Sequence, residues 1–191
     1  MRKAAILLLI ALVLPFSACG KAEPFTQESE SAPEETAVSL PDAMPEDFAV
    51  RFETWFVPER KNVLDTFEGK IEKDLVEDGR AEAVFTPSEP LREELYETIR
   101  ESGIASIRRS MTSHVLATGD ERVSCEPLSC WRVVFRAGGK TYRVDGDATA
   151  WFYRETVPDA GRFAAFCEKM NELLRSLPEF RALPEPRGAY E

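Results

Sequence analysis

The sequence contains very little histidine, no excess of positive charge and no long apolar run, and each gap excludes a class of protein. Its 191 residues include one histidine and carry 24 Lys and Arg against 34 Asp and Glu, for a net charge of −10. A chain of this charge repels a phosphate backbone, so we expect no nucleic-acid partner. Its apolar run at residues 4–16 is shorter than the roughly 20 residues that a transmembrane helix needs.

The sequence also lacks the motifs of common hydrolases and metal sites. His114 has no Gly-x-Ser-x-Gly elbow and no Ser-x-x-Lys pair to accompany it, so we interpret it as a loop or surface residue. Cys125, Cys130 and Cys167 could join His114 as nominal zinc ligands, but the pair at 125 and 130 has no matching second pair. We therefore predict no catalytic residue of a recognisable kind, no metal and no cofactor.

The N-terminus carries an export signal. Arg2 and Lys3 precede the apolar run at residues 4–16, which is the layout of a secretory signal peptide. The following residues, Phe16-Ser17-Ala18-Cys19, resemble the lipobox of bacterial lipoproteins. The resemblance implies that residues 1–18 are removed and that Cys19 carries a diacylglyceryl group, whose two acyl chains suffice for stable anchoring. A soluble secreted protein is the alternative. The expected location is the extracytoplasmic face of the cell membrane.

The next segment is acidic and rich in proline. Residues 20–47 hold eight acidic side chains, one basic side chain and four prolines, and they show no apolar periodicity. Such a segment cannot bury enough apolar surface to fold. We predict a lipidated cysteine and disordered acidic tether over residues 19–47. Residues 48–191 then form a single domain, long enough to bury one core.

Alternating patterns in this domain predict antiparallel strands. Residues 48–57 alternate apolar and polar side chains, and a polar turn is expected at residues 58–62. A weaker alternation from Phe67 to Leu75 predicts a second strand, and residues 81–85 a short third one. Consecutive strands joined by turns indicate a meander.

A hairpin is predicted at residues 131–145. Gly138 and Gly139 accept the positive φ that a two-residue turn requires. Pairing outward from this turn matches side chains of compatible chemistry across the strands: Phe135 with Tyr142, Val133 with Val144, and Arg132 with Asp145. Residues 148–154 are expected to add another strand.

Two amphipathic helices complete the predicted fold. Thr86 is a candidate cap for the first, which Gly103 ends; Pro158 begins the second and Pro178 ends it. Apolar side chains recur at helical spacing at Leu91, Leu95 and Ile99, and at Phe163, Phe166, Met170, Leu173, Leu174 and Leu177. We expect an α+β fold, an antiparallel sheet of meander plus hairpin with both helices packed on it, and an extended tail over residues 179–191.

The domain also resembles a family of small uncharacterised lipoproteins of Gram-positive-type bacteria. The resemblance rests on four segments: residues 65–69 (Asp-Thr-Phe-Glu-Gly), 73–75 (Lys-Asp-Leu), the helix at 91–99, and 183–190 (Leu-Pro-Glu-Pro-Arg-Gly-Ala-Tyr). It implies a location at the membrane and brings no reaction and no catalytic residues.

Three smaller features have both a structural and a functional interpretation. Cys125 and Cys130 are expected to form a disulfide in an exported protein, rather than a redox site. Asp145 and Asp147 could bind calcium, but a turn explains them better because no further ligands follow. Trp151 and Tyr153 would share one side of a strand, as core residues or as a carbohydrate- or peptide-binding pair.

These observations favour a protein that works by contact. The expected role is a membrane-tethered module that binds an envelope protein or glycan, or assists in the envelope, without catalysis. The alternative is an envelope hydrolase with a site of scattered carboxylates such as Asp145 and Asp147.

Overall fold

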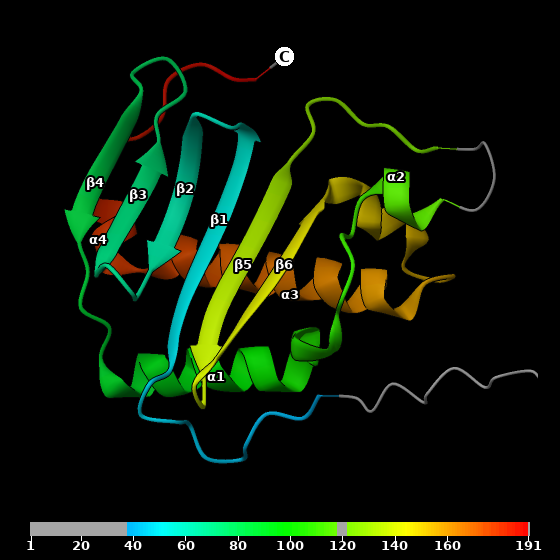
Figure 1. The fold of residues 1–191 in the computed structure, drawn as a ribbon. Helices are drawn as coiled ribbons and strands as arrows, with labels where there is room; N and C mark the ends of the chain where they lie inside the picture. The colour runs from blue at the N-terminus through cyan, green and yellow to red at the C-terminus, as the bar shows by residue number, and fades with distance from the viewer. Residues whose placement is uncertain (1–37, 118–121, 191) are drawn as a thin grey trace, which may run out of the picture. The chain divides into compact units, whose positions relative to one another are not determined.

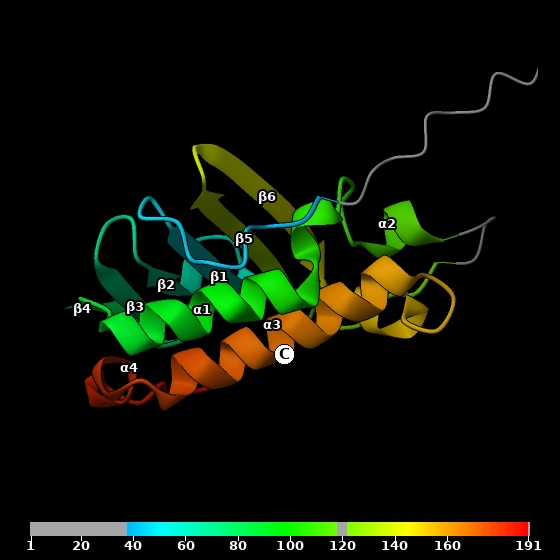
Figure 2. The same cartoon turned by 90° about the horizontal axis from the view of Figure 1, so that it is seen from below.

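The described part of the chain, residues 38–117 and 122–190 of a computed structural model, forms one sheet covered by helices on one face. The six strands are antiparallel, in the order β4-β3-β2-β1-β5-β6 (Figure 1). Both long helices, α1 and α3, lie on the same face (Figure 2). The α+β prediction is confirmed. The elements are β1 (Ala49–Val57), β2 (Arg60–Asp65), β3 (Lys70–Asp74), β4 (Arg80–Val84), α1 (Glu89–Ser102), α2 (Ser113–Leu116), β5 (Cys130–Ala137), β6 (Lys140–Asp147), α3 (Pro158–Ser176) and α4 (Pro178–Ala182).

The first four strands form a meander, whereas three strands with different boundaries were predicted. Residues 58–62 were expected to be a turn, yet most of them belong to β2. Their polar side chains suit a strand because one face of the sheet is open, and Lys61 pairs there with Glu53 across β1 (Nζ to Oε2, 2.7 Å). Phe67, expected in a strand, lies in the turn between β2 and β3 and is 40% exposed.

The β5–β6 hairpin has the predicted register. Phe135 pairs with Tyr142, Val133 with Val144 and Arg132 with Asp145. The prediction of a further strand at residues 148–154 is wrong, because a 3₁₀ helix, Ala148–Tyr153, follows β6. Its start is fixed locally: the Asp147 carboxylate accepts a hydrogen bond from the Thr149 backbone N–H at 2.9 Å.

The two predicted helices are α1 and α3. Ser88, not Thr86, occupies the N-cap position of α1, while Gly103 ends it with φ 65°, as a C-terminal glycine does. Pro178 ends α3 but also begins α4, so the expectation of an extended chain from residue 179 is wrong. Among residues 38–117 and 122–190, no helix combines the length and the apolar character that crossing a membrane requires.

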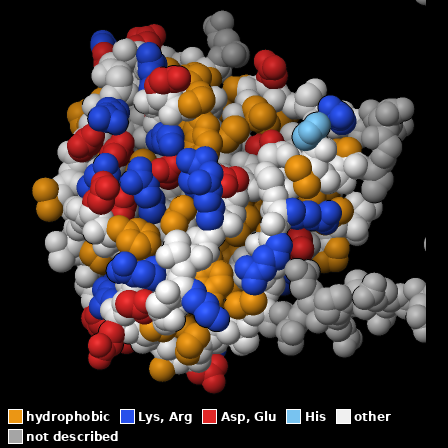
Figure 3. All heavy atoms as spheres, viewed as in Figure 1, with side chains coloured by type: hydrophobic (Ala, Val, Ile, Leu, Met, Phe, Trp, Pro, Cys, Tyr) orange, Lys and Arg blue, Asp and Glu red, His pale blue; other side chains and the backbone are white. Residues whose placement is uncertain are grey.

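The core lies between the sheet and the two long helices. Phe52 of β1 meets Phe166 of α3 edge to face, with ring centroids 6.4 Å apart. Trp131 of β5 meets Phe163 of α3 in the same way at 6.1 Å. Within the described residues, no helix lies on the other face of the sheet, and many charged side chains are exposed there among apolar ones (Figure 3).

The folded part begins before residue 48. Residues 38–47, predicted as the end of the tether, pack on the domain: Leu40 is buried, and Tyr96 of α1 donates a hydrogen bond to the Pro41 carbonyl at 2.6 Å. Asp47 accepts hydrogen bonds from the backbone N–H groups of Gly138 and Gly139 in the β5–β6 turn. The apolar residues within this acidic segment therefore find partners that only the tertiary fold provides.

Candidate functional site

The residues singled out first, the cysteines and the histidine, do not form a joint site. Cys19 lies outside the described residues. His114 is exposed on α2, and Cys125, Cys130 and Cys167 are free thiols. The bridge between Cys125 and Cys130 is not formed in the structure and stays a prediction. Within the described ranges, no three His, Cys, Asp or Glu residues are grouped to hold a metal ion.

The two carboxylates of the hydrolase alternative both have structural partners. Asp145 accepts hydrogen bonds from Arg132 Nε at 2.5 Å and from Arg143 Nε at 2.6 Å. Burial raises the pKa of Asp145, but these two guanidinium groups outweigh it and leave the pKa lowered. Asp147 accepts from the Thr149 backbone N–H and hydroxyl. These carboxylates therefore stabilise the hairpin and the 3₁₀ helix that follows it.

The aromatic residues after β6 do not alternate as a strand would require. In the 3₁₀ helix, Trp151 and Phe152 are the exposed pair, at 41% and 57%, and Tyr153 packs against the core. The Arg154 guanidinium lies 4.5 Å from the Trp151 ring. Trp151 and Tyr153 therefore do not share an exposed side, and the exposed aromatic pair is Trp151 and Phe152.

The open face of the sheet carries many charges, but they neutralise one another. Glu53 lies at its centre and contacts three cations, Arg51, Lys61 and Arg132. Figure 3 shows blue and red side chains interspersed over this face rather than gathered by sign. Glu53 therefore neutralises charge at the centre of this face.

A cavity of about 520 Å³ lies at one end of the sheet, which we call the end cavity. This volume falls within the roughly 300–1,000 Å³ of small-molecule sites. Its walls come from the ends of β1, β2 and β3, from α3 and α4, and from the C-terminal segment, residues 183–190. The lining residues are Phe56, Asn62, Lys73, Asp74, Val76, Pro127, Arg175, Phe180, Arg181, Glu185, Pro186, Ala189 and Tyr190.

Lys73 is the buried cation of the end cavity. Its side chain is 7% exposed, and its ammonium group lies 5.1 Å from the centre of the Phe180 ring. Nζ donates to the Glu185 carboxylate at 3.0 Å and to the Leu183 carbonyl at 3.4 Å. Glu185 itself is 82% exposed. A buried ammonium in this cavity is thus held by a carboxylate that enters from the solvent side.

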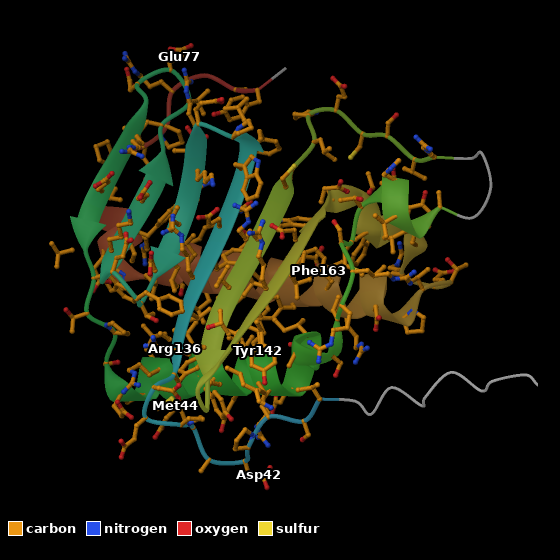
Figure 4. All side chains as sticks on the ribbon, viewed as in Figure 1. Asp42, Met44, Glu77, Arg136, Tyr142 and Phe163 are labelled. Atoms are coloured by element: carbon orange, nitrogen blue, oxygen red, sulfur yellow. The ribbon has the colours of Figure 1, made fainter. Side chains whose placement is uncertain are left out.

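The C-terminal segment forms the outer wall of the end cavity. Figure 1 shows it passing the tips of β3 and β4, and Figure 4 shows Glu77 at the turn between them. The Arg187 side chain forms an ion pair with Asp78 in that turn, and its backbone forms an isolated parallel β-bridge with Val76. Tyr190 donates a hydrogen bond to the Asp74 carboxylate at 2.5 Å. These contacts fasten the segment at two points.

Tyr190 remains protonated in this position. Burial and the hydrogen bond to Asp74 raise the pKa of Tyr190 to about 12. Its ring lies 5.2 Å from that of Phe56, which is 44% exposed. Together these two rings give the end cavity an apolar wall.

The charge balance of the end cavity is positive. Asp74 and Glu185 are both engaged, by Tyr190 and Lys73. Arg175 and Arg181 are exposed, and neither side chain makes an ion pair or hydrogen bond with any residue in the described ranges. The two guanidinium groups therefore remain available in a chain whose net charge is −10.

No protein-family model matches the chain, and no curated protein is similar to it. The sequence alone did not indicate the end cavity, because Lys73 and Glu185 are 112 residues apart. Two segments on which the lipoprotein resemblance rests, residues 73–75 and 183–190, come together at this cavity.

Proposed function

We propose that this protein is a membrane-anchored, extracytoplasmic binding module whose ligand occupies the end cavity. The observation that carries the proposal is the composition of the cavity: an apolar wall of Phe56 and Tyr190 beside the two guanidinium groups of Arg175 and Arg181. Binding sites combine an apolar lining with a few polar groups that orient the ligand in this way. The expected anchor is the lipidated Cys19.

The position of the cavity also supports a binding role. The described chain begins at Val38, at the end of the sheet opposite the C-terminal segment (Figure 1). The end cavity therefore lies away from the residue at which the described domain begins. The hydrolase alternative gains no support, because Asp145 and Asp147 are held by structural hydrogen bonds.

The test is calorimetric titration of the full-length protein in detergent with a neutral probe, indole-3-acetamide. We expect binding to the unaltered chain and its loss in Ala189→Trp, which places a large ring in the cavity. Ala182→Trp is the matched control, because Ala182 is exposed on α4 and does not line the cavity. Thermal midpoints establish that both variants fold.

Two results would contradict the proposal. The first is equal binding of the probe by Ala189→Trp and the unaltered chain. The second is a hydrolytic activity that a single substitution of Asp145 or Asp147 abolishes, which would favour the enzyme alternative instead.

A further inference from the structure

We infer that the end cavity selects a small organic acid, a carboxylate on an apolar body, with Arg175 and Arg181 receiving the acid group. The inference rests on the proposed function and adds the chemistry of the ligand. A planar guanidinium matches the geometry of a carboxylate, which it can bind through two parallel hydrogen bonds.

Arg175 and Arg181 have no acidic partner among the described residues, and their positions in their helices do not explain why. Arg175 lies in the last turn of α3 and Arg181 in the last turn of α4, where a cation interacts favourably with the helix dipole. That interaction needs no hydrogen bond from the guanidinium. Its N–H donors have no acceptor among residues 38–117 and 122–190, so they are available to a ligand.

The chain itself shows that a carboxylate enters this cavity. Glu185 reaches in from the solvent side and holds Lys73 at 3.0 Å, although its own side chain is 82% exposed. Besides Lys73, the cavity offers the acid group of a ligand two cations, Arg175 and Arg181. Both carboxylates that line the cavity already accept hydrogen bonds from the chain. A second acid group on the ligand is not required, because Glu185 already neutralises the buried ammonium.

The volume of the cavity and its lining residues determine the size and the apolar character of the rest of the ligand. A volume of about 520 Å³ accommodates a compact molecule and excludes a folded partner. Phe56, Tyr190 and Phe180 line the cavity with aromatic rings that can pack against an apolar body. The ligand class is therefore an amphipathic monocarboxylic acid.

The experiment compares indole-3-acetate with indole-3-acetamide, which differ only in the acid group, by calorimetric titration of the full-length protein at pH 7. The acid should bind about tenfold or more tightly than the amide. The double variant Arg175→Gln, Arg181→Gln should lose this preference and keep its affinity for the amide. The double variant Arg108→Gln, Arg109→Gln changes the net charge equally at exposed positions outside the cavity, and it should retain the preference.

Each other outcome overturns a defined part of the argument. Equal affinity for acid and amide, or equal loss of preference in both double variants, overturns the inference and leaves the binding module standing. Failure of both probes to bind overturns the proposed function together with the inference.

Discussion

At the residue scale, the open face of the sheet depends on one buried carboxylate. The Glu53 side chain is only 4% exposed, and it accepts hydrogen bonds from Arg51 Nε at 2.6 Å and Lys61 Nζ at 2.7 Å. Burial raises the pKa of Glu53, but these two partners outweigh it and leave the pKa lowered. A carboxylate with a lowered pKa in the folded state stabilises the fold above its unfolded pKa, and this contribution is lost as the pH falls through the folded value.

Glu53→Gln should therefore destabilise the fold at neutral pH more than in acid. Hydrogen bonds to charged groups contribute about 1.5–3 kcal/mol, and with partners near the surface we expect the lower end, about 1.5 kcal/mol at pH 7. The difference should begin to shrink as the pH falls below the ordinary glutamate pKa of about 4.3, where the unfolded chain takes up the proton, and it should disappear once the pH has passed the lowered pKa of the folded state. Denaturant unfolding from pH 3 to pH 7 measures it. Glu94→Gln, at an exposed position of α1, is the control. An equal loss at both pH values would mean that Glu53 contributes by packing and not by charge.

At the element scale, the packing of α3 against the sheet depends on a glycine in β6. A Cβ on Gly146 of β6 would clash with the Phe163 ring of α3 and lie 2.8 Å from the Met111 carbonyl oxygen. The backbone of Met111 forms two hydrogen bonds with β6: its N–H donates to the Asp145 carbonyl, and its carbonyl accepts from the Asp147 N–H. Figure 4 shows Phe163 beside β6. Neither neighbour can move without disturbing the core.

Gly146→Ala should consequently cost about 1–3 kcal/mol, the range of an overpacked core. The measurement is the free energy of unfolding in denaturant. Thr141→Ala, on the exposed part of the same strand, is the control and should stay within about 0.5 kcal/mol of the unaltered chain. A Gly146→Ala protein as stable as the control would show that α3 is not held against β6 by this contact.

At the scale of the whole molecule, the proposed function depends on where the domain is held. The sequence predicts that Cys19 carries lipid, and the structure places the start of the described chain away from the end cavity. Under the proposed function, the lipidated Cys19 keeps the module near a membrane while it searches for its ligand, and we propose that the acidic segment before the domain is a spacer.

Cys19→Ala should release the protein from the membrane fraction or leave its signal peptide uncleaved. The reason is that the acyl chains, and not an apolar helix, provide the expected anchor. Fractionation of intact cells and the mass of the mature protein measure this. Cys125→Ala, outside the signal, should remain membrane-bound and lipidated. The prediction fails if Cys19→Ala retains both the location and the mass of the unaltered chain.

The patterns that the sequence determined by itself are local ones. The register of the β5–β6 hairpin follows from Gly138 and Gly139, because a two-residue turn sets which residues face each other. The apolar stripe of α3 follows from helical periodicity. The prediction of a strand at residues 148–154 was wrong because local structure there follows the cap. Asp147 caps a 3₁₀ helix, which forms in place of the strand that the alternating aromatic residues indicated.

Only the tertiary structure decided which residues meet. Lys73 and Glu185 are far apart in the chain, and α4, which brings Phe180 over Lys73, was not expected. Arg175 and Arg181 read in the sequence as ordinary surface charges. They become candidate ligand-binding residues because they lie beside an apolar wall and have no side-chain partner in the part of the chain that the structure describes. Periodicity reports which face of an element is buried, whereas a cavity depends on the gap left between elements after they have packed.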